Sequence, residues 1–128
     1  MKKSFILIIM LVSVLALGYS QQTVLWNVDT ASAWIEAVNG IRNGSNNITH
    51  TIIITGSFPV IVTPSSEFTF GSITGITVTI EGNGIISPAG NGSLLRVGNG
   101  QVVNIRDITM RGRENNNTPV VVVGSGGT

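Results

Sequence analysis

The chain has 128 residues, with seven Lys or Arg, six Asp or Glu, and no cysteine. This length suits a single domain, and the lack of cysteine excludes disulfides, cysteine-based metal sites and lipid attachment at a cysteine. Both lysines precede residue 21, and the remaining five arginines and six acidic residues leave that part near neutral. This composition argues against nucleic-acid binding, which needs a basic patch.

Residues 1–20 have the pattern of a secretory signal peptide. Lys2 and Lys3 are followed by an apolar run over residues 5–17, and Gly18 and Ser20 are small residues just before Gln21. The run is short for a bilayer core about 30 Å thick, although an uncleaved membrane anchor is the alternative. We therefore expect an exported protein at the cell surface, in the periplasm or outside the cell, with no membrane span after signal removal.

The next segment, residues 21–50, contains one predicted helix over residues 31–43. Its apolar residues recur at helical spacing, namely at Ala31, Trp34, Ile35, Val38 and Ile41. Asp29 or Thr30 can cap its first turn, and Gly44 can end it in a left-handed conformation.

From residue 51 onward the sequence repeats at an offset of 25 or 26. TIIITGS begins at residue 51, TVTIEGN at residue 77 and VVNIRDI at residue 102. Similarly, VVVVGSGG at residue 120 repeats LLRVGNGQ at residue 94. Such periods indicate stacked repeats. Each period contains three short β-rich runs, namely 51–55, 58–62 and 68–70; 77–81, 84–87 and 94–97; and 102–106, 108–111 and 119–123.

These runs predict an all-β fold, a right-handed parallel β-helix of about three coils over residues 51–128, with the helix capping its first coil. An antiparallel sandwich and a propeller are the alternatives. The expected inward columns are Ile52/Val78/Val103 and Ile54/Ile80/Ile105. The expected outward residues are Thr51, Thr77, Thr79, Asn104 and Arg106. Gly56, Gly82, Gly98 and Gly124 are expected at corners, where positive φ is often needed.

The signal peptide, the helix ASAWIEAVNGIRNG and the runs TVTIEGNGIISPAGNGSLLRVGNG and VVNIRDITMRGRENNNTPVVVVGSGGT resemble the N-terminal part of bacterial exported parallel β-helix proteins, the pectate-lyase-like superfamily. Within it they are most similar to surface or adhesin-type repeat proteins. The resemblance implies an architecture rather than a chemistry. It also implies that enzymes of this superfamily, which cleave acidic polysaccharides, use grooves on coils further along than these.

No catalytic, cofactor-binding or metal-binding residues are predicted, and no cofactor. Catalysis on a polysaccharide needs clustered carboxylates, and at the expected register none of the four carboxylates in the coils faces another: Glu67, Glu81, Asp107 and Glu114. His50 has no partner in the pattern and is expected to be structural or solvent-facing. Arg106, Arg111 and Arg113 could contact an anionic glycan, although a solvated face is the simpler interpretation.

These observations favour a non-enzymatic, exported surface or adhesin-type β-helix protein. The alternatives are part of a carbohydrate-active β-helix enzyme and a truncated remnant without independent function. Surface or matrix glycans or proteins are the expected partners. The chain ends in a run of valines followed by Gly-Ser-Gly-Gly-Thr, without a cap. We therefore expect it to be truncated at its C-terminus and to associate edge to edge.

Overall fold

The computed structural model describes residues 21–128, so the predicted signal peptide lies outside the described residues. The described part is mostly β, with one α-helix and nine strands. The elements in chain order are β1 (Thr23–Val28), α1 (Ala31–Arg42), β2 (Thr49–Ile54), β3 (Ser57–Val60), β4 (Ile76–Gly82), β5 (Ile85–Pro88), β6 (Leu95–Val97), β7 (Gln101–Ile105), β8 (Thr109–Met110) and β9 (Val121–Val123).

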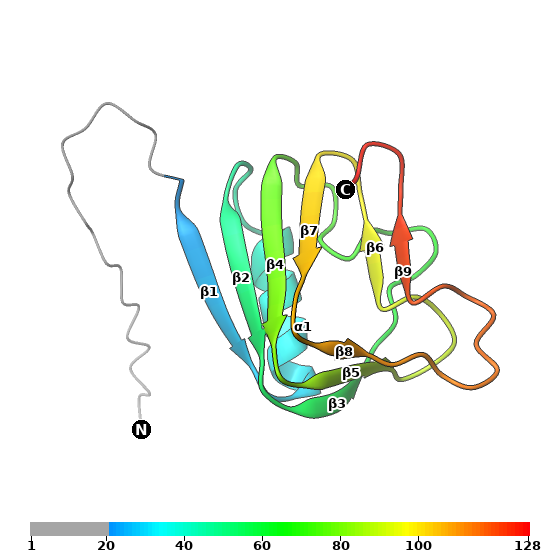
Figure 1. Cartoon of the computed structure of the whole chain (residues 1–128). Coiled ribbons are helices and arrows are strands. Elements are labelled where there is room, and N and C mark those ends of the chain that lie inside the picture. Colours follow the sequence, from blue (N-terminus) through cyan, green and yellow to red (C-terminus); the bar gives the residue numbers. More distant parts are fainter. Residues whose placement is uncertain (1–20) are drawn as a thin grey trace, which may run out of the picture.

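The strands form three parallel sheets (Figure 1). The four-stranded sheet has the order β1-β2-β4-β7, the three-stranded sheet β3-β5-β8, and the two-stranded sheet β6-β9. The chain therefore visits the sheets in a fixed order and returns to the first one. We call each visit a pass: β1–α1, β2–β3, β4–β5–β6 and β7–β8–β9. The predicted parallel pairing with the counterpart one repeat away is confirmed for the runs that form strands, whereas the predicted run at residues 68–70 forms no strand.

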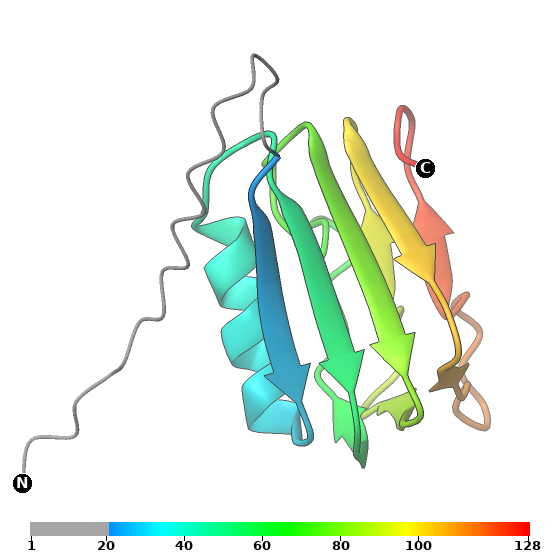
Figure 2. The same ribbon diagram turned by 60° about the vertical axis from the view of Figure 1, so that its left-hand side comes forward.

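Strand β1 was not predicted, and it adds one pass before the expected first coil. It pairs in parallel with β2, with Thr23 opposite Thr49 and Val28 opposite Ile54. These partners are one repeat apart in the sequence, at the same offset of 26 that recurs later in the chain. Four strands thus lie side by side where the sequence predicted three (Figure 2).

The predicted register of the first period is wrong by two positions. Thr51 lies opposite Thr79 rather than Thr77, and Ile52 lies opposite Ile80. The inward row is therefore Ile52–Ile80–Ile105, and Ile54 lies opposite Gly82 instead. Because side chains alternate between faces along a strand, a slip of two positions preserves which side chains point inward. The assignment of inward and outward faces is correct, whereas the assignment of neighbours is not.

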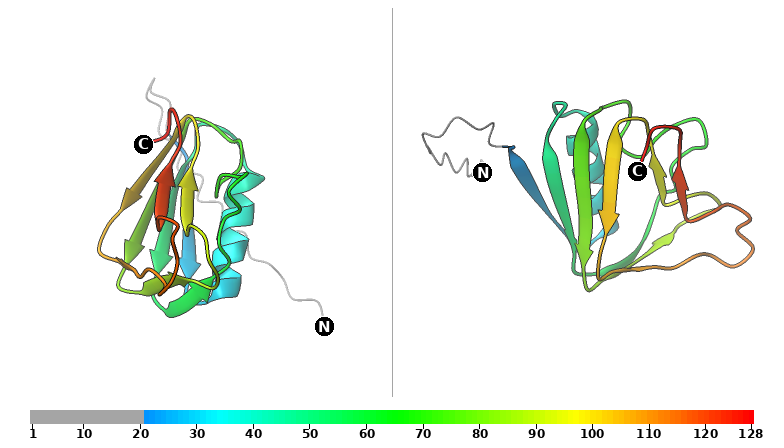
Figure 3. Two further views of the ribbon diagram at one scale, coloured as in Figure 1. Left: turned by 90° about the vertical axis from the view of Figure 1, so that its right-hand side faces the viewer. Right: turned by 45° about the horizontal axis from the view of Figure 1, so that its top comes forward.

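Helix α1 lies beside β1 and contacts β1 and β3 (Figures 2 and 3). The hydroxyl of Thr30 accepts a hydrogen bond from the Ala33 amide at 3.2 Å, which confirms Thr30 as the N-cap. The C-terminal prediction is wrong, since Asn43 is the C-cap with φ −96° and Gly44 lies outside the left-handed region.

The buried face of α1 also differs from the predicted one. Trp34 is 3% exposed and joins the hydrophobic core, as expected. Ile35, expected to cover the first coil, is 38% exposed, and Ala37 and Ile41 are buried instead. Val38 is half-buried and packs against the core. The helix therefore covers the core with a face turned toward positions 34, 37 and 41, which recur at helical spacing.

One left-handed turn recurs along the chain with nearly the same backbone conformation. Asn47, Gly75 and Gly100 come just before strands β2, β4 and β7, and Gly126 follows β9; their φ angles are 62°, 70°, 69° and 74°. The glycines are joined through the backbone, since the Gly75 amide donates to the Gly100 carbonyl and the Gly100 amide donates to that of Gly126 at 2.9 Å. Glycine is favoured here because L side chains rarely adopt this conformation.

The corner glycines predicted from the sequence only partly follow that rule. Gly82 has φ 133°, as predicted, but Gly56, Gly98 and Gly124 lie outside the positive-φ region. Gly56 is instead needed for space, because a Cβ there would collide with the backbone carbonyl of Asp29 in the preceding pass. Glycine is therefore needed at position 56 because two backbone segments lie close together at the corner, and not because of its φ angle.

A buried glutamine holds one of these turns in place. Gln101 is 1% exposed, and its side-chain amide donates to the carbonyls of Gly71 at 3.0 Å and Ile73 at 2.9 Å. Its carbonyl oxygen accepts from the Gly98 amide at 2.9 Å. Three hydrogen bonds thus satisfy a buried polar side chain and join the turn before β7 to the loop before β4.

The segment between β3 and β4 departs most from the repeat. The predicted extended run at residues 68–70 is a turn rather than a strand. Phe70 is fully buried, while Phe68 lies against Gly98 and Gly124 and is 37% exposed. Because this loop is longer than its counterpart, β2 and β4 pair at an offset of 28, whereas β4 and β7 pair at an offset of 25. The longer loop is the physical reason for the register error.

Candidate functional site: the outer face of the four-stranded sheet

The outward side chains of the four-stranded sheet form ordered rows across the strands. One row contains Thr23, Thr49, Thr77 and Val102. The next contains Leu25, Thr51, Thr79 and Asn104. Parallel strands place neighbours in a row about 4.8 Å apart, and neighbouring rows are about 6.6 Å apart along each strand. Five threonine hydroxyls therefore form a regular array on one face.

These threonines stand outward because the residues between them fill the core. In β4, Ile76, Val78 and Ile80 are buried, whereas Thr77 and Thr79 are half-buried. β-Branched threonine suits a pleated strand, and its hydroxyl can both donate and accept a hydrogen bond. The face thus carries hydroxyl groups and little charge, together with the exposed apolar side chains of Leu25 and Val102.

A pocket lies at the β7 side of this face. It is open, has a volume of about 480 Å³, and is lined by Thr79, Val103, Asn104, Ile105 and Arg106. The lining contains both inward positions of β7, Val103 and Ile105, and outward positions, Thr79, Asn104 and Arg106. The pocket therefore lies at the β7 edge of the sheet, beside the outward row of Thr79 and Asn104.

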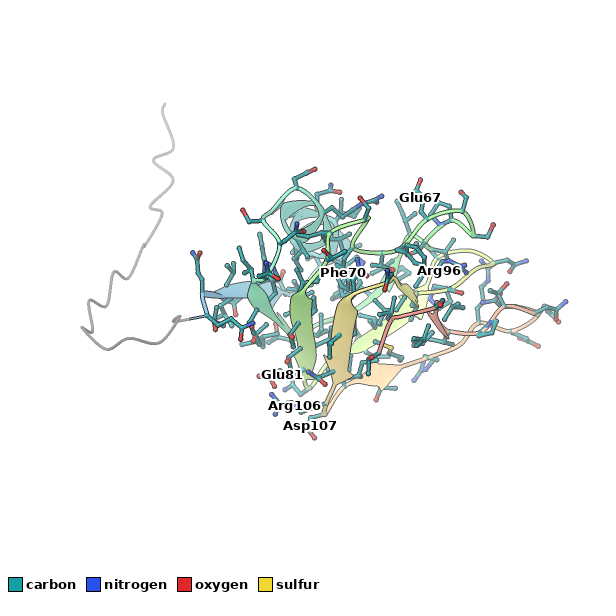
Figure 4. The ribbon with its side chains drawn as sticks, turned by 90° about the horizontal axis from the view of Figure 1, so that it is seen from above. Glu67, Phe70, Glu81, Arg96, Arg106 and Asp107 are labelled. Carbon is teal, nitrogen blue, oxygen red and sulfur yellow. The ribbon has the colours of Figure 1, made fainter. Side chains whose placement is uncertain are left out.

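An ion pair borders the pocket. The Arg106 guanidinium binds the Glu81 carboxylate on the neighbouring strand. Figure 4 shows both residues at one corner of the molecule, next to Asp107. Asp107 is exposed with φ 55°, which agrees with its expected role as a solvated corner charge. The pairing leaves this end of the face close to neutral.

The other two carboxylates considered from the sequence lie elsewhere, and Glu114 is exposed in a turn after β8. Glu67 binds the Arg42 guanidinium at 2.8 Å, and its backbone carbonyl accepts from the Arg96 side chain at 3.0 Å. Figure 4 places Glu67 and Arg96 far from Glu81 and Arg106. Glu67 and Glu81 are thus each held by an arginine, and the structure does not bring them together.

The predicted arginine cluster is divided among separate partners. Arg106 pairs with Glu81, while the Arg113 guanidinium donates to the Ala89 carbonyl at 3.0 Å. Arg111 is exposed. Within residues 21–128, no group of three His, Cys, Asp or Glu side chains could hold a metal ion.

His50 was expected to be structural or solvent-facing, and its burial agrees with a structural role. Its position in the fold differs from the predicted one. It lies inside β2 rather than before the first strand, and it is 3% exposed. Its Nδ1 accepts a long hydrogen bond, 3.4 Å, from the indole nitrogen of Trp26. Burial lowers the pKa of His50 below its ordinary value of 6.5.

Sequence reasoning missed the threonine rows, although a signal was present. Residues 48–52 read ITHTI and residues 76–80 read ITVTI, a match at an offset of 28. That match, rather than the offset of 26, gives the register of the structure. The Thr-x-Thr pairs on both strands would then have been placed side by side.

Comparison with known proteins found no matching family model, no matching curated protein and no matching solved structure. The helix in the part of the chain that the structure describes is too short to cross a membrane. The site must therefore be interpreted from its own geometry.

Proposed function

We propose that this chain forms coils of a right-handed parallel β-helix in an exported, non-enzymatic surface protein of the adhesin type. The three parallel sheets visited in a fixed order support this architecture, as does the recurring left-handed turn. Crossovers between parallel strands of one sheet are right-handed in about 98% of cases. Export rests on the signal-like residues 1–20.

The proposed activity is binding of a neutral or weakly charged glycan by the outer face of the four-stranded sheet. The observation that carries it is the array of threonine hydroxyls beside the pocket at Asn104 and Arg106. A polysaccharide presents hydroxyl groups at regular intervals, and a rigid strand array offers donors and acceptors at regular intervals. Little ordering of the protein is needed on binding, which favours affinity.

The carboxylate arrangement supports binding without turnover. Retaining and inverting glycosidases need two carboxylates about 5–9.5 Å apart across the bond that is cleaved. Glu81 and Glu67 are each held by an arginine and lie in separate parts of the molecule. Asp107, which lies next to Glu81, is exposed to solvent at a corner.

A glycan array followed by calorimetry on the best ligand tests the proposal. The variant Thr51→Val/Thr79→Val removes two hydroxyls but keeps β-branched side chains, so we expect an unchanged fold. Loss of two hydrogen bonds worth about 1 kcal/mol each should weaken binding roughly 10- to 30-fold. Thr109→Val, an exposed change in β8 of another sheet, is the matched control.

Three outcomes would count against this function. If Thr109→Val weakened binding equally, the four-stranded sheet would not be the specific binding face. If the double variant bound the glycan unchanged, the threonine hydroxyls would not contribute to binding. Release of oligosaccharides from the bound glycan would favour the alternative, part of a carbohydrate-active enzyme.

Edge-to-edge association is part of the same proposal. Strands β8 and β9 are each paired on one side, whereas the second side of β7 is partly covered by Thr128, whose backbone bonds to Gln101 and Val103. Apolar side chains near these edges are exposed, with Ile105 at 41% and Val123 at 54%. Unpaired strand edges promote pairing with another chain. Analytical ultracentrifugation should show a sedimentation coefficient that rises with concentration, whereas a constant monomer value would contradict association.

A further inference from the structure

Trp26 joins three elements at the β1 side of the molecule. Its ring lies against Gly40 of α1 so closely that a Cβ at Gly40 would collide with the ring. Its indole nitrogen donates to Nδ1 of His50 in β2, and the two ring centroids are 6.5 Å apart at an interplanar angle of 34°. One side chain of β1 thus contacts both the helix and the next strand.

The hydrogen bond assigns the tautomer of the neutral His50 ring. Because Nδ1 accepts from Trp26, the neutral ring carries its proton on Nε2. That Nε2 is buried and finds no hydrogen-bond partner in the part of the chain that the structure describes. His50 therefore contributes only one satisfied polar atom to the core, and this atom needs the neutral ring.

Within residues 21–128, no charged group compensates for a proton on this ring. Strand β1 has no ionisable residue, and the one in β4, Glu81, points outward to Arg106. In and beside α1, Glu36 and Asp29 are exposed, and Arg42 pairs with Glu67. Burial is accordingly the cause of the lowered pKa of His50.

We propose that protonation of His50 releases β1 from the edge of β2, so that Trp26 and His50 form an acid-sensitive contact. Both nitrogens of an imidazolium are donors, so the protonated ring cannot accept from Trp26. The positive charge would also be buried among apolar side chains without a partner. Separation of β1 from β2 lets water reach the ring and removes both costs.

The direction of the pH dependence follows from linkage. The neutral form is favoured in the closed state, so closure is fully favoured above the ordinary pKa of 6.5 and is lost as the pH falls below it. Opening exposes the strand edge of β2 and the inward side of the first pass. Acid would therefore create a new pairing edge at the side opposite β7.

Hydrogen exchange on the intact chain tests this directly. Between pH 7.5 and pH 5, we expect exchange of the β1 amides, corrected for the intrinsic effect of pH, to accelerate by up to about 30-fold, the limit set by an ordinary pKa of 6.5. Amides of β4 should change much less. His50→Gln is the matched control, because its amide oxygen can still accept from Trp26 but does not titrate, and it should abolish the acceleration.

A second measurement needs no variant. His50 is the sole histidine of the chain, so its ring resonances can be followed by NMR without ambiguity. A titration midpoint at or above 6.5, with β1 amides still protected below it, would overturn the proposal. The same conclusion would follow if His50→Gln accelerated with acid as much as the natural chain. Trp26→Phe, which keeps a ring but removes the donor, should raise the titration midpoint of His50.

Discussion

Ile52 of β2 lies directly beside Ile80 of β4, and both side chains are fully buried. Their row continues to Ile105 of β7, which is 41% exposed because β7 is the last strand of its sheet. Truncation of Ile80 removes a side chain with neighbours on both sides. We expect Ile80→Ala to reduce the free energy of unfolding by about 2–5 kcal/mol, measured by urea denaturation.

Ile105→Ala is the matched control for that measurement, since it makes the same chemical change in the same row. Its side chain is only partly removed from water, so the cost should be clearly smaller than that of Ile80→Ala. Equal costs for the two variants would contradict the burial gradient along this row.

The helix face gives a second prediction. Trp34 is 3% exposed, and Trp34→Ala should cost roughly 3–5 kcal/mol because it leaves a large cavity between α1 and the sheets. Its neighbour Ile35 is 38% exposed, so Ile35→Ala should cost less than about 1 kcal/mol. Thermal unfolding followed by circular dichroism distinguishes the two. If Ile35→Ala lowered the free energy of unfolding more than Trp34→Ala, Ile35 would lie on the buried face of the helix, as the sequence predicted.

The recurring left-handed turn gives a third prediction. Gly75 has φ 70°, and a Cβ there would collide with the side chain of Asn47 in the preceding pass. Gly75→Ala should therefore destabilise the protein by at least about 1–2 kcal/mol. Gly90→Ala places a methyl group where no atom lies within 4 Å, and it should be near neutral. Similar effects for both would exclude the turn as a structural requirement.

Some features of the fold could be predicted from the sequence because they depend on local patterns. The helix followed from apolar spacing and from Thr30 before its first turn. Parallel stacking followed from the repeat between residues 77–81 and 102–106, where β4 and β7 pair at an offset of 25. The helix signal lies within a single segment. The repeat signal lies between two segments whose connection has the regular repeat length.

The register of β2 could not be chosen in the same way. Either Ile52 or Ile54 can lie opposite Ile80, and because these alignments differ by two positions, the inward pattern is the same in both. Only the match of residues 48–52 with residues 76–80 distinguishes them in the sequence. The irregular loop around Phe70 sets the choice, and its length is not that of the repeat. Strand β1 was missed because α1 separates it from β2, and without β1 the contact between Trp26 and His50 could not be anticipated.

Engineered cysteine pairs test the stacking on which both proposals depend, and the chain has no cysteine of its own to interfere. Disulfides need Cα atoms about 4.4–6.8 Å apart, a distance that paired residues on adjacent parallel strands meet at about 4.8 Å. The account predicts that Thr51→Cys/Thr79→Cys forms a disulfide on oxidation, detected by mass spectrometry. Thr51→Cys/Thr77→Cys, displaced by two positions along the strand, should remain reduced. The register, and with it the threonine rows, would be contradicted if the Thr51/Thr77 pair oxidised preferentially. It would also be contradicted if neither pair formed a disulfide in the folded protein.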